Sequence, residues 1–202
     1  TVWSMGEDGD CYAVMSTSME NGYSAGGYKI QGRMINNNTV QPLENITNYN
    51  VREGRLYSAV AIYGEVHLVY VEEDNETIRY CWRNAKSGKW DIQDELISDY
   101  TTRFTSPISS YTYPVIGFDD ATNGTFVNWF TRQDESGWYS VREDGSWTER
   151  ERIVHHENLF IDADPNIVTP IGPKVMFSFV AYNGSTAKRE IWSYIYWPFT
   201  KN

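Results

Sequence analysis

Hydrophobic and polar residues alternate in short runs along almost the whole chain. Runs rich in β-branched and aromatic residues, such as VHLVYV and VNWF, are separated by clusters of Gly, Asn, Asp and Ser at intervals of roughly ten residues. No window has apolar residues at i, i+3, i+4 and i+7 over three turns, so no amphipathic helix is predicted. The pattern predicts an all-β protein of the sandwich, barrel or propeller type.

One hairpin pattern recurs along the chain. Val66 to Trp90, VHLVYVEEDNETIRYCWRNAKSGKW, is repeated in GTFVNWFTRQDESGWYSVREDGSW, in PKVMFSFVAYNGSTAKREIWSYIYW and, more degenerately, in DGDCYAVMSTSMENGYSAGGYKIQG. An earlier strand precedes each copy, in TVWSMG, YSAVAIYG, YPVIGF and NIVTPIG. The strand-two cores YAVM, LVYV, VNWF and FSFV recur at intervals of roughly fifty residues, which is the length of a four-stranded propeller blade.

These repeats predict a single all-β domain over residues 1–202, folded as a small β-propeller of about four four-stranded blades. The approximate repeats are 1–52, 53–107, 108–160 and 161–202. Each hairpin buries one face and needs a neighbour, so several copies together form a core that one copy cannot form. A β-sandwich of the same hairpins is the alternative. Whether the ring closes within one chain, or a homo-oligomer completes it, stays open.

Charge and hydropathy narrow the choice of partners. The net charge is −10, which argues against nucleic acid, because nucleic acid needs a basic face on its partner. No run of eighteen apolar residues occurs, so we expect no membrane insertion. The first residues, TVWSMGEDGD, lack the basic and apolar segments of a signal peptide, so if the protein is secreted we expect this to be its mature form.

The glycosylation sequon N-x-S/T points to the secretory pathway and an extracellular location. It occurs five times, and three copies fall in apparent turns between strands, where a bulky glycan fits. The alternative is that Asn, Gly and Thr simply form turns and the sequons are unused. The expected glycosylation sites are Asn37, Asn45, Asn75, Asn123 and Asn183.

Cysteine and histidine indicate no metal centre. Cys11 and Cys81 lie in strand-like runs and are either one disulfide or two small buried residues. No CxxC, HExxH or Cys and His pair at ligand spacing occurs. His155 and His156 precede the acidic run ENLFIDADP, but adjacent strand residues point to opposite faces, so we expect a solvated loop there. No motif indicates a cofactor.

Aromatic residues form 15% of the chain, with 8 Trp and 15 Tyr. Their flat apolar faces and polar edges suit sugar rings, planar ligands and interfaces, although small β-repeats also use them as core wedges. DGSW, at Asp144 to Trp147, is similar to the Asp-box turn of sialidase-type propellers, which is a structural motif. The aromatic content therefore favours a binding protein without naming its ligand.

The second repeat, SAVAIYGEVHLVYVEEDNETIRYCWRNAKSGKW, resembles a blade of the fungal fucose-specific lectins. In that family a strand of small residues precedes a strand ending in VYYQ, an acidic turn, a third strand reading IRE and a Gly-Trp. Here LVYV, EEDNET, IRY and GKW stand in the same order, and the third repeat keeps QDESG and DGSW. The resemblance implies a secreted β-propeller lectin that binds a glycan between blades or in a central pocket.

The family also implies the chemistry of the site. There, an Arg at the start of strand two and a Glu on strand three hold sugar hydroxyls, and a Trp or Tyr stacks on the ring; a guanidinium and a carboxylate can each bridge two adjacent hydroxyls. Here His67 and Lys174 stand at the Arg position, Tyr80 replaces the Glu of the second repeat, and Glu190 matches it in the fourth. No repeat carries the whole set. The implied ligand-binding residues are His67, Arg79, Trp82, Lys174, Glu190 and Trp192.

Two other functions stay open. A secreted enzyme on the lectin fold could guide a cyclisation or pericyclic reaction of a small apolar molecule by orientation alone, so its catalytic residues would be unknown. No GxSxG indicates a serine hydrolase, and no spacing selects a glycosidase carboxylate pair. The third function is an effector that binds another protein through its acidic face. A lectin should show similar polar and aromatic sites on several repeats, and an enzyme one deep aromatic pocket.

Overall fold

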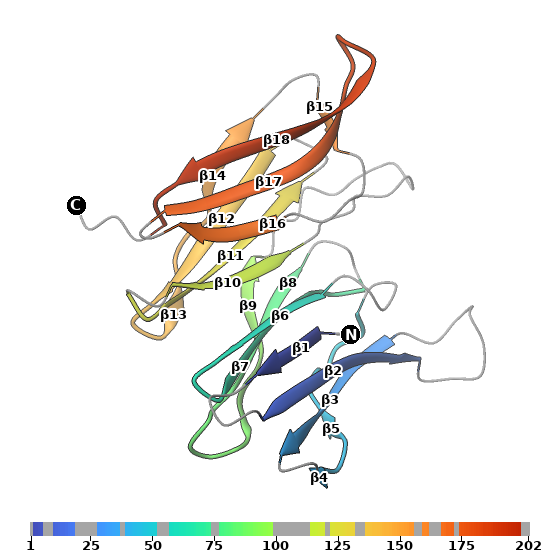
Figure 1. The fold of residues 1–202 in the computed structure, drawn as a ribbon, viewed down its shortest axis with the longest axis vertical. Helices are drawn as coiled ribbons and strands as arrows, with labels where there is room; N and C mark the ends of the chain where they lie inside the picture. The colour runs from blue at the N-terminus through green and yellow to red at the C-terminus, as the bar shows by residue number, and fades with distance from the viewer. Residues whose placement is uncertain are drawn as a thin grey trace. The chain divides into compact units, whose positions relative to one another are not determined.

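Every regular element in the described part of the chain is a β-strand (Figure 1). The chain divides into two units, Thr1–Tyr100 and Thr101–Asn202, and each contains two antiparallel sheets. The prediction of an all-β fold is confirmed. The computed structural model describes residues 2–5, 10–18, 28–36, 39–51, 57–73, 77–98, 114–119, 122–131, 136–155, 159–161, 167–171 and 174–198.

The first sheet, sheet A, is an antiparallel meander with a divided outer strand. Its strands are β1 (Val2–Met5), β2 (Cys11–Ser18), β3 (Tyr28–Asn36), β4 (Thr39–Val40) and β5 (Glu44–Asn45). Both β4 and β5 pair with β3, through Ile35↔Val40 and Gln31↔Asn45. Two short segments therefore share the outer edge of β3.

Sheet B is a four-stranded antiparallel meander, with register shifts between β8 and β9. Its strands β6 (Tyr57–Ile62), β7 (Glu65–Val71), β8 (Ile78–Arg83) and β9 (Trp90–Ser98) lie in sequence order. The turn between β6 and β7 consists of Tyr63 and Gly64, which have φ angles of 51° and 76°. Positive φ at both central positions is the type I′ geometry that matches the twist of a two-residue hairpin.

Sheet C has a divided outer strand like that of sheet A. It contains β10 (Val115–Asp119), β11 (Gly124–Thr131), β12 (Ser136–Glu143), β13 (Ser146–Trp147) and β14 (Glu151–His155), and both β13 and β14 pair with β12. Asp144 and Gly145 form the turn between β12 and β13, with φ angles of 49° and 82°. The DGSW motif is thus a hairpin turn.

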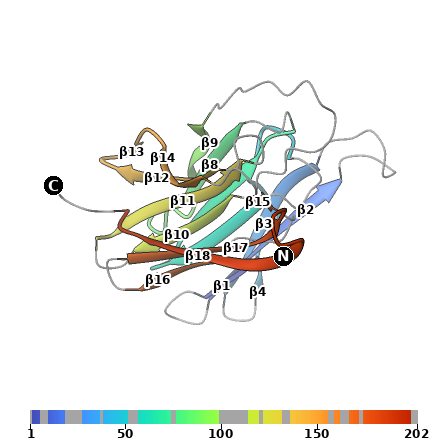
Figure 2. The same cartoon turned by 90° about the horizontal axis from the view of Figure 1, so that it is seen from above.

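Sheet D contains β15 (Leu159–Ile161), β16 (Ile167–Ile171), β17 (Lys174–Asn183) and β18 (Lys188–Tyr196). β15 and β16 pair with the same edge of β17, and β18 pairs along the whole other edge (Figure 2). In the described part of the chain, β18 pairs only with β17. By contrast, β3, β8 and β12 in the other three sheets are each paired along both edges.

Each unit has its own apolar core between its two sheets. Strand residues two positions apart share a face, which is why alternate residues enter the core. Val51 adds a link in the first unit, because it bridges Tyr28 of β3 and Glu72 beyond β7. The first core is formed by Tyr12, Val14, Ile30, Ile46, Val51, Val66, Leu68, Tyr70 and Cys81. The second is formed by Phe126, Phe130, Val141, Val154, Val175, Phe177, Phe179, Ala181 and Tyr196.

The strand order matches the predicted repeats closely. The four first strands that the repeats predicted are β1, β6, β10 and β16, and the strand-two cores lie in β2, β7, β11 and β17. Two features were missed: the division of the outer strands in sheets A and C, and β15, which straddles the predicted boundary at residue 160. That the chain forms one domain with the stated repeat boundaries stays a prediction.

Candidate functional site

Four side chains from both sheets of the first unit form one group, which we call the Glu44 cluster: Tyr12, Glu44, Arg83 and Trp90. Tyr12 lies on β2 and Glu44 begins β5, whereas Arg83 ends β8 and Trp90 begins β9. Its hydrogen bonds join residues up to 78 positions apart in the sequence. The cluster therefore exists only once sheets A and B have packed together.

A tight turn sets the sheet B half of the cluster. The Asn84 N–H donates to the Lys89 carbonyl at 2.9 Å, and the Gly88 N–H donates to the Asn84 carbonyl at 2.9 Å. Gly88 has a φ of 64°, in the left-handed region that glycine adopts without strain. This turn holds Arg83 and Trp90 as direct cross-strand partners.

A glycine sets the sheet A half. A Cβ at Gly32 would lie 2.3 Å from Cε1 of Tyr12, closer than any real contact. Gly32 is also the cross-strand partner of Glu44. The missing side chain on β3 lets the phenol of Tyr12 lie across the strand and reach the Glu44 carboxylate.

Three donors of the cluster converge on one carboxylate oxygen, and the Trp90 indole also donates to the Tyr12 hydroxyl at 3.2 Å. Glu44 Oε2 accepts from the Tyr12 hydroxyl at 2.9 Å and from the Trp90 indole Nε1 at 2.9 Å, and Arg83 Nε lies 3.5 Å from it. The Tyr12 and Trp90 rings meet edge to face with centroids 5.8 Å apart, and the guanidinium carbon of Arg83 lies 5.2 Å from the Tyr12 ring centroid. Indole, phenol, carboxylate and guanidinium thus occupy one junction.

Three groups of the cluster, Tyr12, Arg83 and Glu44, differ in how far solvent reaches them. Tyr12 is 2% exposed, and burial raises the pKa of its phenol, so it stays protonated and acts as a donor. The Arg83 side chain is 9% exposed and that of Glu44 31%. Solvent therefore reaches the carboxylate while the phenol behind it stays dry.

Two polar edges of the cluster make no hydrogen bond in the described part of the chain. They are Oε1 of Glu44 and the two terminal nitrogens, Nη1 and Nη2, of Arg83. A Cβ built on Gly88 would lie 3.7 Å from Nη2, so a turn without a side chain borders the guanidinium. The Glu44 carboxylate oxygen Oε1, a strong acceptor, and the terminal nitrogens of Arg83, which are donors, thus belong to the same cluster as the half-buried indole of Trp90.

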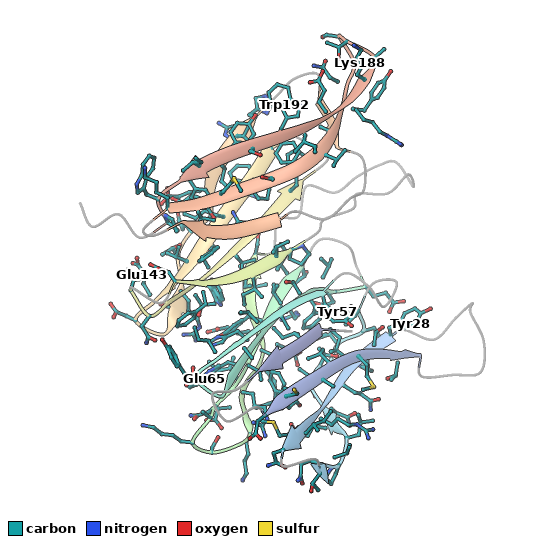
Figure 3. All side chains as sticks on the ribbon, in the orientation of Figure 1. Tyr28, Tyr57, Glu65, Glu143, Lys188 and Trp192 are labelled. Carbon is teal, nitrogen blue, oxygen red and sulfur yellow. The ribbon has the colours of Figure 1, made fainter. Side chains whose placement is uncertain are left out.

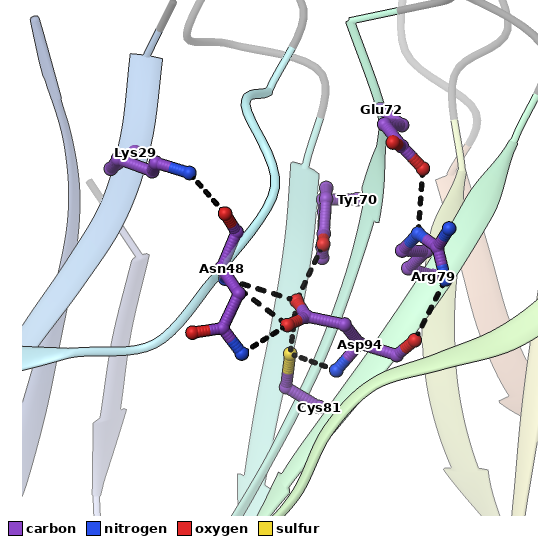
Figure 4. Close-up of polar contacts among 7 residues, drawn as sticks. All are labelled: Lys29, Asn48, Tyr70, Glu72, Arg79, Cys81 and Asp94. Carbon is purple, nitrogen blue, oxygen red and sulfur yellow. Dashed lines mark hydrogen bonds and ion pairs between the residues drawn. The ribbon is translucent and has the colours of Figure 1, made fainter.

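A second carboxylate between sheets A and B has the opposite arrangement (Figure 4). Asp94 accepts from the Tyr70 hydroxyl at 2.6 Å and from the Asn48 backbone and side-chain nitrogens at 3.1 and 2.6 Å. The Cys81 thiol lies 3.9 Å from Oδ1, and burial raises its pKa. Both oxygens of Asp94 are occupied, so this group fastens the segment that follows β5 to sheet B.

Of the implied ligand residues in sheet B, Trp82 and His67 are direct cross-strand partners. Glu65 accepts from the Trp82 indole at 3.1 Å and lies 3.5 Å from His67 Nε2, while His67 Nδ1 lies 2.7 Å from the Tyr80 hydroxyl. This is a second contact between a carboxylate and an indole, at the start of β7 where Figure 3 labels Glu65.

The structure places Arg79 away from Trp82. The two residues are three positions apart on β8, so their side chains point to opposite faces of sheet B. Arg79 Nε donates to Glu72 at 2.6 Å, Nη1 donates to the Asp94 carbonyl at 3.0 Å, and the guanidinium carbon lies 3.9 Å from the Tyr49 ring centroid. Arg79 therefore belongs to the Asp94 group.

In sheet D, Glu190 and Trp192 lie two residues apart on one face of β18. Figure 3 labels Trp192 and Lys188, the first residue of that strand. Glu190 accepts from Asn183 at 3.2 Å and from Thr186 at 2.8 Å, and these bonds, with a smaller contribution from Trp192, lower its pKa. A carboxylate and an indole therefore share one face of this strand.

Lys174 lies apart from that pair. It begins β17, whereas Glu190 pairs with Ala181, seven residues along the strand and so roughly 23 Å away. Lys174 Nζ lies 5.1 Å from the Trp197 ring centroid. Within sheet B the implied residues His67 and Trp82 therefore lie together without Arg79, and within sheet D Glu190 and Trp192 lie together without Lys174.

Three sequons fall within the described residues. The Asn123 side chain is exposed in the turn before β11, and Asn45 is exposed on β5, whereas Asn183 donates to Glu190. Asn37 and Asn75 lie outside the described residues, and glycosylation at all five stays a prediction.

Cys11 and Cys81 are not joined by a disulfide bond in the structure, and Cys81 is a buried core residue that contacts Asp94. His155 lies on β14, 3.1 Å from Ser136 Oγ, and His156 is outside the described residues. No helix long and apolar enough to cross a bilayer occurs among the described residues.

Sequence reasoning missed Tyr12, Glu44 and Arg83 as site residues. The segment RNAKSGKW signals a turn that brings an Arg opposite a Trp, and Trp90 is the last residue of the hairpin pattern that begins at Val66. Nothing in the sequence indicates that Glu44, 46 positions before Trp90, reaches the same point.

The sequence matches no protein-family model and no curated protein. Among solved structures the chain is similar to a variant of the Aleuria aurantia lectin in complex with Fucα1-6GlcNAc, with a TM-score of 0.58 and 17% identity over 91% of this chain and 53% of that one. It is also similar to the exo-β-1,3-galactanase of Phanerochaete chrysosporium in complex with β-1,3-galactotriose, with a TM-score of 0.50 and 10% identity over 93% of this chain and 42% of that one.

The chain thus spans about half the length of these proteins. At these identities the likeness shows the fold alone. It confirms the predicted fold class, because the described sheets match the lectin-like β-propeller fold.

Proposed function

We propose that this chain is a carbohydrate-binding, lectin-like module and that the Glu44 cluster binds the glycan. The observation that carries the proposal is the pair of unused polar edges, Glu44 Oε1 and the terminal nitrogens of Arg83, beside the indole of Trp90. A sugar offers adjacent hydroxyls that donate to a carboxylate and accept from a guanidinium. Its apolar ring face suits contact with an indole.

Recurrence of the motif supports a lectin over an enzyme with a single pocket. The indole donates to a carboxylate at Trp90 and Glu44 and at Trp82 and Glu65, and Glu190 and Trp192 share one face of β18. Similar polar and aromatic sites on several repeats are the arrangement expected of a lectin. The fold similarity to a lectin and to a galactanase agrees with this proposal.

Secretion and N-glycosylation are further parts of the proposal. They rest on the sequons, of which Asn45 and Asn123 present exposed side chains. Mass spectrometry of the natural protein would detect the glycans as mass shifts on those peptides. Unmodified peptides at every sequon would contradict this part.

The test is a glycan array followed by calorimetric titration of the best ligand. Trp90→Ala should weaken binding by about 10- to 100-fold, which corresponds to roughly 1 to 3 kcal/mol for the loss of an aromatic anchor. Leu96→Ala is the matched control, because Leu96 is an exposed apolar residue on the same strand, β9, and should bind like the wild type. An array without any signal would refute the lectin function.

A further inference from the structure

The charges of the Glu44 cluster balance at the point where a ligand would enter. Glu44 contributes one negative charge and Arg83 one positive charge, and they are 3.5 Å apart at the nearest atoms. Neither residue has another ion-pair partner among the described residues. A ligand at this junction therefore meets a neutral pair with one acceptor edge and one donor edge.

This balance, which rests on the proposed function, determines the class of sugar. We propose that the Glu44 cluster selects uncharged glycans and rejects glycans that carry a uronic acid, a sialic acid or a sulfate at the contacted position. A neutral hydroxyl donates to Glu44 Oε1 and accepts from Arg83 at the same time, so it satisfies both edges.

An anionic group on the ligand would satisfy only half of the cluster. It would pair with the Arg83 fork, but it would also lie against the Glu44 carboxylate and leave Oε1 without a donor. A net charge of −10 on the whole chain adds repulsion at low ionic strength. A cationic ligand meets the reverse problem at Arg83.

Glu44 is therefore the residue that excludes acidic sugars. Glu44→Gln is the decisive variant, because an amide keeps the shape and an acceptor oxygen but removes the charge that balances Arg83. We expect this variant to bind acidic glycans more tightly than the wild type does and to lose at least part of the preference for neutral ones. Arg83→Gln is the matched control, because it also removes one charge but leaves the carboxylate.

The experiment uses an array that carries neutral oligosaccharides and the same backbones with a uronic acid or a sulfate. The wild type should prefer the neutral member of each pair by about tenfold or more, and Glu44→Gln should lower that preference about tenfold or more. Arg83→Gln should weaken neutral binding without gaining acidic ligands. Circular dichroism checks that each variant is folded.

Each outcome separates the two proposals. A wild type that prefers acidic glycans, or a folded Glu44→Gln variant that binds with an unchanged preference, overturns the selection rule and leaves the lectin function standing. A wild type that binds no glycan overturns both. If Glu44→Gln does not fold, the salt dependence of wild-type binding provides the test. The dissociation constant of the wild type for its neutral ligand should vary less than about twofold between 0.05 and 0.5 M salt. A steep loss with salt would refute a charge-balanced site.

Discussion

Glu44 and Asp94 are both carboxylates held between the two sheets of the first unit, yet the protein surrounds them differently. Asp94 is 8% exposed, and both its oxygens accept hydrogen bonds from Tyr70 and Asn48. The side chain of Glu44 is 31% exposed, and all its described bonds converge on Oε2. One carboxylate has no remaining acceptor position directed at a ligand, and the other has a whole oxygen available.

The arginines beside them differ in the same way. Arg79 is used by Glu72, by the Asp94 carbonyl and by the Tyr49 ring, whereas Arg83 uses only Nε toward Glu44 and lies against the Tyr12 ring. Saturated polar groups hold a fold together, and partly saturated ones retain hydrogen-bonding capacity for a partner. The difference separates a structural group from a binding group within the same unit.

The largest expected effect is on stability, at Asp94. Asp94→Asn should lower the free energy of unfolding by about 3 kcal/mol, because an amide nitrogen replaces an acceptor among buried donors. Asn tolerates the φ of 61° at this position, so backbone strain adds little. Urea unfolding measures the loss, and glycan binding by the folded fraction should be unchanged. A variant as stable as the wild type would show that the Asp94 group is not structural.

A paired substitution of the arginines sharpens the contrast. Arg79→Met should cost about 1.5 kcal/mol of stability, because it removes two charge-assisted hydrogen bonds on a side chain that is 18% exposed, and should leave glycan binding intact. Arg83→Met should weaken binding about tenfold or more, with the smaller loss of stability. Thermal unfolding and calorimetric titration of both variants give the four values. If instead Arg79→Met weakened glycan binding and Arg83→Met mainly lowered stability, Arg79 would belong to the binding group and Arg83 to the structural one.

The sequence predicted what depends on local periodicity. Strand cores such as LVYV and VNWF, and turns such as Asp144-Gly145, were readable because a two-residue period and a positive φ are local properties. The pairing of Glu190 with Trp192 also follows from two-residue spacing on one strand. The divided outer strands were missed because segments of two residues, such as β4 and β13, carry no periodic signal.

The Glu44 cluster could not be predicted for the opposite reason. Tyr12 and Trp90 are 78 positions apart, and their contact depends on how sheets A and B pack and on the open space above Gly32. Lectin-like motif positions directed attention to Arg79 and Lys174, whose side chains lie against Tyr49 and Trp197. Residue type and motif order indicated the kind of chemistry, but packing decided which residues carry it.

The buried phenols of Tyr70 and Tyr12 can be tested at alkaline pH, where a smaller effect is expected. Burial raises the pKa of both Tyr70 and Tyr12 above the ordinary value of 10.0. Above that pH the unfolded chain releases these protons while the native state keeps them, so stability should fall by about 1.4 kcal/mol per pH unit for each phenol. Tyr70→Phe should make the fall of stability with pH less steep by the contribution of one phenol, as measured by urea unfolding from pH 9 to 11. An unchanged slope would show that Tyr70 ionises normally in the native state.

The smallest expected effect concerns a third carboxylate, that of Glu190, whose two oxygens are both hydrogen-bonded although the residue is only half-buried. Both Glu190 oxygens accept hydrogen bonds, from Asn183 and Thr186, and these bonds lower its pKa. A lowered native pKa stabilises the hairpin above the ordinary pKa of glutamate, and this contribution is lost as pH falls through the native value. Asn183→Ala should raise the pKa of Glu190 toward its ordinary range, as followed by carboxyl carbon NMR. Because water competes for a carboxylate that is only half-buried, we expect almost no change in global stability at neutral pH. A pKa that does not move would show that Asn183 does not hold Glu190, which would leave Oε2 open to a ligand while Thr186 holds Oε1, and Glu190 would then resemble Glu44 rather than Asp94.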